Sequence, residues 1–197
     1  MDFRTRIDLY LWSGNGDKSA TNGSGEVRFY NLRPQGYLFD PSKYHGCIVS
    51  LGSFQSLPMK QTGYDGIVGA NSKAGAAVHF QVLDVSQPNS ITNFNSSSAG
   101  VSTYSSNAKI LKTLQWSGET ILIGNGAVDN QYALTYRASD PIAEGVFVSY
   151  PLEEMTVRLI NSSGAIVDLS DVVEDTDGSD IDCNWSAHII VQPILKD

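Results

Sequence analysis

The C-terminal part of the sequence constrains the fold of this chain more than any other stretch. Apolar and polar side chains alternate over 155–160, and the turn formers of 161–164 follow directly. The pattern predicts a strand that enters a tight turn at Gly164, where glycine adopts a positive φ without a Cβ clash, and returns over 165–169. The run 185–195 is rich in β-branched and aromatic residues, which predicts a long strand paired inside a sheet.

The same alternation recurs along the rest of the sequence in short runs separated by turn-forming residues. It predicts further strands over 5–12, 26–32, 45–54, 77–83, 108–114, 120–124, 131–137 and 145–150. No run has a helical period, and 59–74 and 86–107 are interpreted as long loops. We therefore expect one domain over 1–197, an all-β, single jelly-roll-type β-sandwich of about eight to ten strands with long loops.

The composition agrees with a globular β protein and excludes several classes of function. Hydrophobic residues make up 41% and charged residues 17% of the 197-residue chain, and Ser, Thr, Asn and Gly dominate its polar remainder. The net charge of -8 argues against general affinity for nucleic acid or anionic membranes. No apolar run approaches the length of a membrane span and no secretory signal is visible, which predicts a soluble protein made in a cytoplasm.

The residue types that carry chemistry do not form a catalytic pattern. The Gly-rich stretch 13–25 lacks the P-loop spacing, because Asp17 stands directly before Lys18. There is no GxSxG or HExxH motif, and the three histidines are isolated from one another in the sequence. Cys47 and Cys183 are predicted to be reduced and partly buried thiols, in preference to a disulfide. The sequence therefore predicts a protein that is not an enzyme and has no cofactor.

An acidic segment before the last predicted strand holds the candidate metal ligands. Carboxylates alternate around Gly178, as in a calcium loop, and the candidate ligands are Asp175, Asp177 and Asp180. The segment lacks the full EF-hand spacing and its terminal bidentate Glu. The pattern favours a solvated loop whose charge deters edge pairing, so no metal site is predicted.

Aromatic residues supply the candidate binding groups. Tyr10 and Trp12 share the strand face opposite Leu9 and Leu11, which indicates either a face covered by a second subunit or a loop, or two ordinary surface aromatics. A carbohydrate- or receptor-binding module could stack sugars on exposed aromatic rings. The candidates for that role are Trp12, Tyr64, Tyr104 and Trp116.

The terminal strands resemble those of a known family. The runs 155–159, 163–169 and 185–191 look like the last strands of single jelly-roll capsid proteins, most closely the penton and minor capsid proteins of virophages and related double-stranded DNA viruses. The resemblance implies a structural virion protein without enzymatic activity, made in the host cytoplasm. Its implied partners are other copies of itself, as a homopentamer if it is a penton, and other capsid proteins. A glycan- or receptor-binding sandwich is the alternative function.

Overall fold

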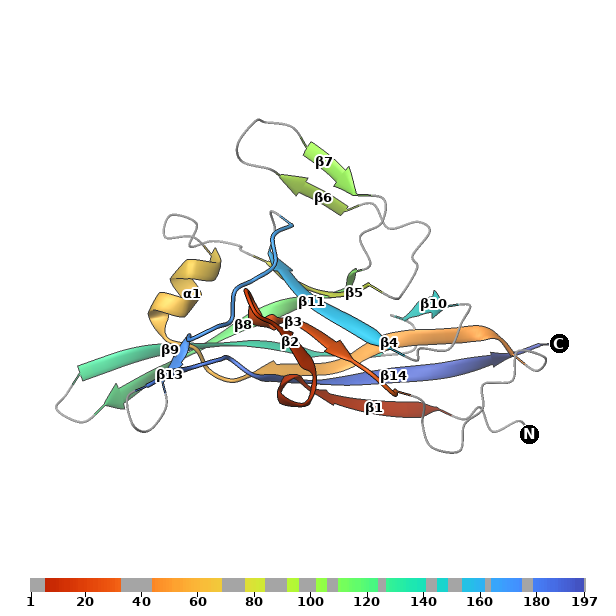
Figure 1. Ribbon diagram of the computed structural model, residues 1–197, viewed down its shortest axis with the longest axis horizontal. Coiled ribbons are helices and arrows are strands. Elements are labelled where there is room, and N and C mark those ends of the chain that lie inside the picture. The colour runs from red at the N-terminus through yellow and green to blue at the C-terminus, as the bar shows by residue number, and fades with distance from the viewer. Residues whose placement is uncertain are drawn as a thin grey trace.

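The computed structural model describes residues 6–32, 44–68, 77–83, 92–95, 102–105, 110–123, 127–140, 145–148, 154–161, 164–174 and 179–196 (Figure 1). These residues form strands, one α-helix and one short 3₁₀ helix. The elements are β1 (Ile7–Trp12), η1 (Ser13–Asn15), β2 (Asp17–Ser19), β3 (Gly23–Phe29), β4 (Tyr44–Ser56), α1 (Gln61–Val68), β5 (Val78–Val82), β6 (Thr92–Asn95), β7 (Ser102–Ser105), β8 (Ile110–Ile123), β9 (Ala127–Arg137), β10 (Val146–Val148), β11 (Met155–Asn161), β12 (Val173–Glu174), β13 (Asp180–Ile181) and β14 (Trp185–Leu195).

The eight longest strands pair in the order of a jelly roll. One sheet has the order β1-β14-β4-β9 and the other has the order β8-β5-β11-β3, with every pairing antiparallel. Numbered along the chain, these strands form the orders 1-8-3-6 and 5-4-7-2, the interleaving that two Greek keys produce. The predicted all-β, single jelly-roll-type sandwich is therefore confirmed.

One strand belongs to both sheets and closes one side of the sandwich. The first part of β8 pairs with β5 through Leu114, and its second part pairs with β9 from Gln115 onward. The opposite side is open, because β1 ends one sheet and β2 ends the other (Figure 1). Within the described residues, no strand pairs with the outer edge of β1 or of β2.

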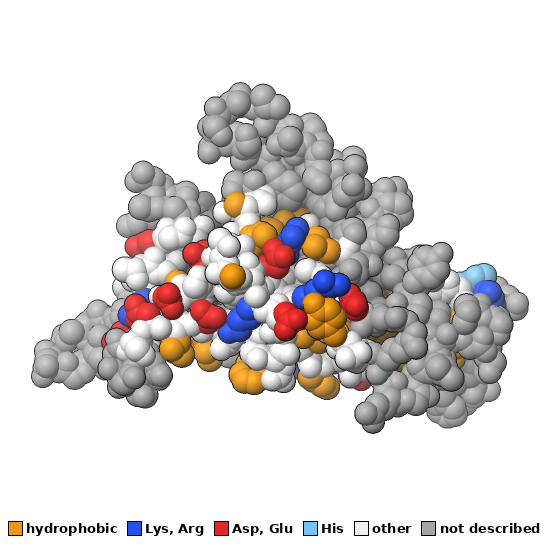
Figure 2. Space-filling model, in the orientation of Figure 1, with side chains coloured by type: hydrophobic (Ala, Val, Ile, Leu, Met, Phe, Trp, Pro, Cys, Tyr) orange, Lys and Arg blue, Asp and Glu red, His pale blue; other side chains and the backbone are white. Residues whose placement is uncertain are grey.

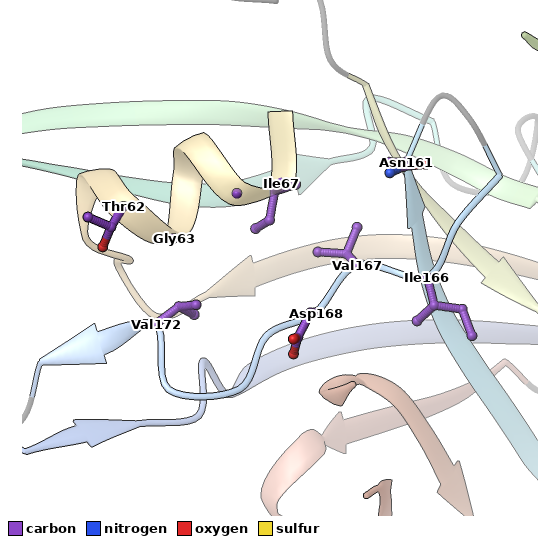
Figure 3. A pocket seen from close by; sticks show the side chains of 9 residues that line it. Thr62, Gly63, Ile67, Asn161, Ile166, Val167, Asp168 and Val172 are labelled. Atoms are coloured by element: carbon purple, nitrogen blue, oxygen red, sulfur yellow. The ribbon is translucent and has the colours of Figure 1, made fainter. Parts of the chain in front are cut away.

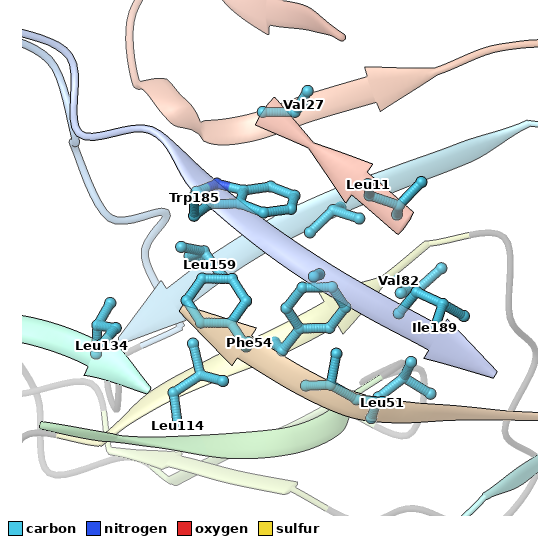
Figure 4. Close-up of a cluster of buried hydrophobic side chains, with 14 of the residues drawn as sticks. Leu11, Val27, Leu51, Phe54, Val82, Leu114, Leu134, Leu159, Trp185 and Ile189 are labelled. Atoms are coloured by element: carbon cyan, nitrogen blue, oxygen red, sulfur yellow. The ribbon is translucent and has the colours of Figure 1, made fainter. Parts of the chain in front are cut away.

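Four aromatic side chains from four strands fill the centre of the core, and two of them, Trp185 and Phe54, are labelled in Figure 4. Trp185 of β14 is 1% exposed, and its ring centroid lies 5.4 Å from that of Phe54, 5.9 Å from Phe29 and 6.0 Å from Phe80. The indole Nε1 donates a 2.7 Å hydrogen bond to the carbonyl oxygen of Ser24 in β3. Trp185 thus joins the two sheets by packing and by a buried hydrogen bond, as a Trp in a core requires.

The prediction of a loop over 59–74 is wrong for 61–68, which form α1; residues 69–74 lie outside the described part. Gly63 and Gly66 lower the helix propensity of this segment and hide it from sequence patterns. Packing against the sheet compensates for this low helix propensity, because the Tyr64 ring stacks on Tyr132 of β9 at a centroid distance of 4.0 Å. The absence of a side chain at Gly63 allows Val172 to pack closely against α1, because an added Cβ would lie 2.7 Å from Val172 Cβ.

The two helix glycines provide a matched pair for a stability test. Gly66→Ala is expected to raise the free energy of unfolding by about 0.5–1 kcal/mol, because a Cβ there meets nothing within 4 Å. Gly63→Ala gains the same helix propensity but forces Val172 away, so we expect a net loss of about 1–2 kcal/mol. Urea unfolding of both variants measures the difference. Equal effects of the two substitutions would show that Gly63 is not a packing contact.

Other strand boundaries predicted from the sequence differ from those in the structure. The two strands expected over 108–114 and 120–124 are one strand, β8, and the segment 86–107 contains the short pair β6 and β7. The strand expected over 165–169 is wrong: after the bridge between Ile160 and Ile166 the backbone leaves the sheet. Leu169 is instead fully buried, and its carbonyl oxygen accepts a 2.8 Å hydrogen bond from the N–H of Cys183.

Both cysteines are free, as predicted, and both are fully buried, where partial burial was expected. Burial raises the pKa of the Cys47 thiol to about 11. Burial likewise raises the pKa of Cys183 to about 12, against the smaller effect of hydrogen bonds with Ser56 and Leu57. Both side chains are therefore thiols at neutral pH, and neither is an activated nucleophile.

Candidate functional site

The outer face of the β1-β14-β4-β9 sheet presents two rows of side chains that run across the strands. We define the Trp12 row by the aligned residues Trp12, Ser186, Gln55, Thr135 and Gln115, of which Gln115 belongs to β8. The neighbouring Tyr10 row consists of Tyr10, His188, Ser53 and Arg137. All nine side chains point away from the core and are exposed or partly exposed. Strand register therefore gathers residues from both ends of the chain on one surface.

The aromatic ring of Tyr10 is held in a fixed orientation although it is 78% exposed. It stacks on the imidazole of His188 with a centroid distance of 4.6 Å and an interplanar angle of 7°. His188 Nε2 is 2.6 Å from Asp8 Oδ1, and Gly52 makes room for the imidazole, because a Cβ there would lie 2.9 Å from Nδ1. One face of the Tyr10 ring is thus covered by protein.

Asp8 is tied into this arrangement by two partners. Desolvation raises its pKa, but hydrogen bonds with Arg6 and His188 have the larger combined effect, so the pKa of Asp8 lies below its ordinary value. The Arg6 guanidinium lies 2.7 Å from Asp8 Oδ1. The carboxylate is therefore compensated by the Arg6 cation, and its hydrogen bond with His188 holds the imidazole in place beneath Tyr10.

Trp12, the other aromatic residue on this face, is also supported by the protein. It is 51% exposed, and its six-membered ring lies against Gly14 of η1, where an added Cβ would be 2.7 Å from Trp12 Cζ2. Tyr10 and Trp12 are two residues apart on one strand face, which places them about 7 Å apart along β1. The pair forms two fixed aromatic surfaces at one end of the two rows.

The rest of the Trp12 row is polar without formal charge. Ser and Thr contribute hydroxyl groups and Gln contributes amides, each of which both donates and accepts hydrogen bonds. The Thr135 hydroxyl already donates a 3.4 Å bond to the backbone oxygen of Gln115. This surface is suited to recognition of a neutral polar partner and has no group arranged for covalent chemistry.

The structure separates the aromatic residues that the sequence grouped as sugar-stacking candidates. Trp12 lies on the outer sheet face, whereas Tyr64 and Trp116 pack edge to face at 4.9 Å and attach α1 to the β8-β9 pair. The Tyr104 side chain lies outside the described residues. Tyr10 was not among the candidates, although its alternation with Leu9 and Leu11 placed it on the same face as Trp12.

Two of the three candidate calcium ligands, Asp175 and Asp177, lie outside the described residues. The third, Asp180, forms an ion pair with Lys60, which also lies 3.8 Å from Glu174. Acidic side chains are spread over this end of the molecule with basic ones among them (Figure 2). Among the described residues, no group of three or more His, Cys, Asp or Glu could hold a metal ion.

A pocket of about 330 Å³ lies between α1 and the chain that follows β11 (Figure 3). Its walls are polar and apolar in equal measure, and they include the exposed carboxylate of Asp168, whose Oδ1 accepts a 3.0 Å bond from the N–H of Ser170. No histidine, cysteine or lysine lines it. The lining residues are Thr62, Gly63, Gly66, Ile67, Asn161, Ile166, Val167, Asp168 and Val172.

His79 and His188 lie on opposite sheets of the sandwich. His79 of β5 lies 2.9 Å, Nδ1 to Oγ1, from Thr113, and burial lowers its pKa. His188 lies on the opposite sheet, in the Tyr10 row. The partner of His79 is thus a threonine hydroxyl, and the partner of His188 is the carboxylate of Asp8.

Comparison with known proteins identifies no protein that is similar to this chain. No helix in the described part of the chain is long and apolar enough to span a membrane. Searches of family models, of curated proteins and of solved structures found no match to this chain. The jelly-roll strand order and the two rows on its outer sheet face are therefore the features from which function is inferred.

Proposed function

We propose that this protein is a structural virion protein, a single jelly-roll capsid subunit that self-assembles into an icosahedral shell as a penton or minor capsid protein. The observation that carries the proposal is the pairing order 1-8-3-6 and 5-4-7-2 in a sandwich with one open side. Jelly rolls of this kind form viral capsid and lectin domains. The likeness of 155–159 in β11 and 185–191 in β14 to the last strands of single jelly-roll capsid proteins supports the first of these.

The open side of the sandwich is the surface that a neighbouring subunit would cover. The outer edges of β1 and β2 carry backbone N–H and C=O groups that no strand of the described chain pairs. The opposite side is closed by β8, so the two sides of a subunit differ. A contact between unlike sides is heterologous, and such contacts form a closed ring when the rotation between neighbouring subunits closes. Five copies in a ring would make a vertex capsomer.

The proposal also states where the protein acts and which proteins it contacts. It is made in the host cytoplasm, acts in the virion, contacts its own copies and other capsid proteins, and has no enzymatic activity. The net charge of -8 fits a shell component that does not itself bind the genome, because genome binding requires Lys and Arg to neutralise phosphates.

Light scattering over a concentration series is the direct test. A stable pentamer is expected for a penton, and a mass that increases when other capsid proteins are added is expected for a minor capsid protein. A chain that stays monomeric at every concentration and binds no other capsid protein would overturn the proposal.

Site-specific labelling maps the assembly contact. The native thiols are buried, so a new cysteine on the surface reacts selectively with a bulky maleimide. We expect assembly to slow the labelling of Asp17→Cys, on the exposed edge strand β2, at least about tenfold relative to the dilute monomer. Ser117→Cys, exposed on β8, reports the other half of a contact between unlike sides and should also label more slowly in the assembly. Gln55→Cys, exposed on the outer face of the interior strand β4, is the control and should label at the same rate in both states. Unchanged labelling of Asp17→Cys in the assembly would contradict the proposed contact.

A further inference from the structure

We propose that the Trp12 row and the Tyr10 row together bind a neutral oligosaccharide. The inference goes beyond assembly, since it concerns the outer face of a sheet, and the assembly contact concerns its edge. A neighbour that covers the edge of β1 leaves side chains on the face accessible, because strand side chains stand perpendicular to the sheet. The two proposals can therefore fail separately.

The aromatic pair supplies the stacking surfaces. A pyranose ring has an apolar C–H face, which packs on a flat aromatic ring. The Tyr10 ring is covered on one face by His188, and the Trp12 ring is covered by Gly14, so each presents its other face to solvent. Both rings remain substantially exposed, at 78% and 51%. Because they are already ordered, binding costs little side-chain entropy.

The polar side chains of the Trp12 row can form hydrogen bonds with the hydroxyl groups of a sugar. Sugar hydroxyls both donate and accept, as do the hydroxyl and amide groups of Ser186, Gln55 and Thr135, which follow Trp12 across three strands. With Gln115 the row crosses five strands, or about 19 Å at an interstrand spacing of about 4.8 Å. This is long enough for several linked sugars laid across the strands.

The charges on this surface select against ionic ligands. The Trp12 row has no ionisable side chain on a chain of net charge -8. The Tyr10 row ends in Arg137, and Asp8 stands beside His188, paired with Arg6. Arg6 and Arg137 against Asp8 leave one net positive charge on this surface. A polysaccharide with a carboxylate on every sugar would meet only that one net positive charge, and a polyamine would meet no net negative charge, whereas a neutral glycan needs neither.

Titration with defined oligosaccharides tests the inference. Cellotetraose and maltotetraose serve as neutral probes and tetragalacturonate as the anionic control, each added up to about 10 mM, enough to detect a Kd of about 1 mM. The readouts are calorimetry and the NMR signals of the three indole N–H groups, of which Trp12 is the exposed one in the outer sheet face. We expect a neutral probe to shift the Trp12 signal and leave the buried Trp185 signal in place.

Variants locate the binding site. Trp12→Ala should weaken binding at least about tenfold, and the double substitution Gln55→Ala with Thr135→Val should weaken it several-fold. Tyr30→Ala is the matched control, since Tyr30 is 44% exposed beyond the end of β3 in the other sheet, beneath the Arg28 guanidinium. Unfolding curves verify that each variant is folded.

Three outcomes would overturn the inference. They are the absence of any Trp12 shift with both neutral probes, binding that survives Trp12→Ala but not Tyr30→Ala, and equal or tighter binding of tetragalacturonate. None of them changes the expected oligomer mass, so a failed glycan site and a failed assembly model give different results.

Discussion

Trp185→Ala should lower the free energy of unfolding by about 4–5 kcal/mol, the largest effect expected for a single core substitution in this protein. The side chain is 1% exposed and contacts aromatic rings from both sheets, so its removal leaves a cavity bounded by β3, β4 and β5. The substitution also removes the indole donor from the carbonyl oxygen of Ser24. Equilibrium unfolding in urea, followed by circular dichroism, measures the change.

Trp185→Phe separates the hydrogen bond from the packing. It keeps an aromatic ring between the Phe residues but has no N–H to donate, so we expect a loss of about 1–3 kcal/mol. A Trp185→Ala variant that lost less than about 1 kcal/mol would contradict the position of this side chain at the centre of the core.

Gly25→Ala should be nearly as damaging, although it adds only one methyl group. A Cβ at Gly25 would lie 1.8 Å from the carbonyl oxygen of Val167 and 3.0 Å from that of Asn22. Both are backbone atoms, and the Asn22 oxygen also accepts hydrogen bonds from the N–H groups of Gly25 and Leu169. The backbone must move to relieve the clash, so we expect a loss of about 3 kcal/mol or more, measured by urea unfolding.

Gly118→Ala is the control for this substitution. Its nearest contacts are ring atoms of Tyr132 at 3.3 Å, and a side chain can shift where a backbone carbonyl cannot. We expect it to cost less than about 1 kcal/mol. Faster hydrogen exchange at the amides of Leu169 and Cys183 should accompany Gly25→Ala alone, because their bonds depend on the displaced backbone. Equal losses from both substitutions would disprove the close approach at Gly25.

The sequence predicted correctly those strands in which nearly every residue favours a β conformation. The bounds expected for β14 agree with the structure, because β-branched and aromatic residues extend over its whole length. β8 was divided in two because Ser117 and Gly118 resemble a break, whereas Gly118 sits in the strand beside the Tyr132 ring. α1 was missed because contacts of Tyr64, made by tertiary packing, stabilise a segment with two glycines.

Only part of the candidate site could be predicted from the sequence. Alternation along β1 placed Tyr10 and Trp12 on one face, and Trp12 was named as a stacking residue. The position of His188 beneath Tyr10, and that of Gln55 two strands away from Trp12, depend on pairing between distant segments. One sequence does not contain strand order, so the two rows became visible only in the structure.

The pairing of β1 with β14 also sets the earliest time at which this protein can fold. Leu11 pairs with Ala187, so β1 waits on the ribosome for a strand that is made about 176 residues later. At about 5–20 residues per second, that wait lasts about 10–35 s. During it β1 and β4 lack the strand that lies between them. Completion of the core therefore follows synthesis of β14, and a pause in translation before residue 185 would leave these strands open to aggregation.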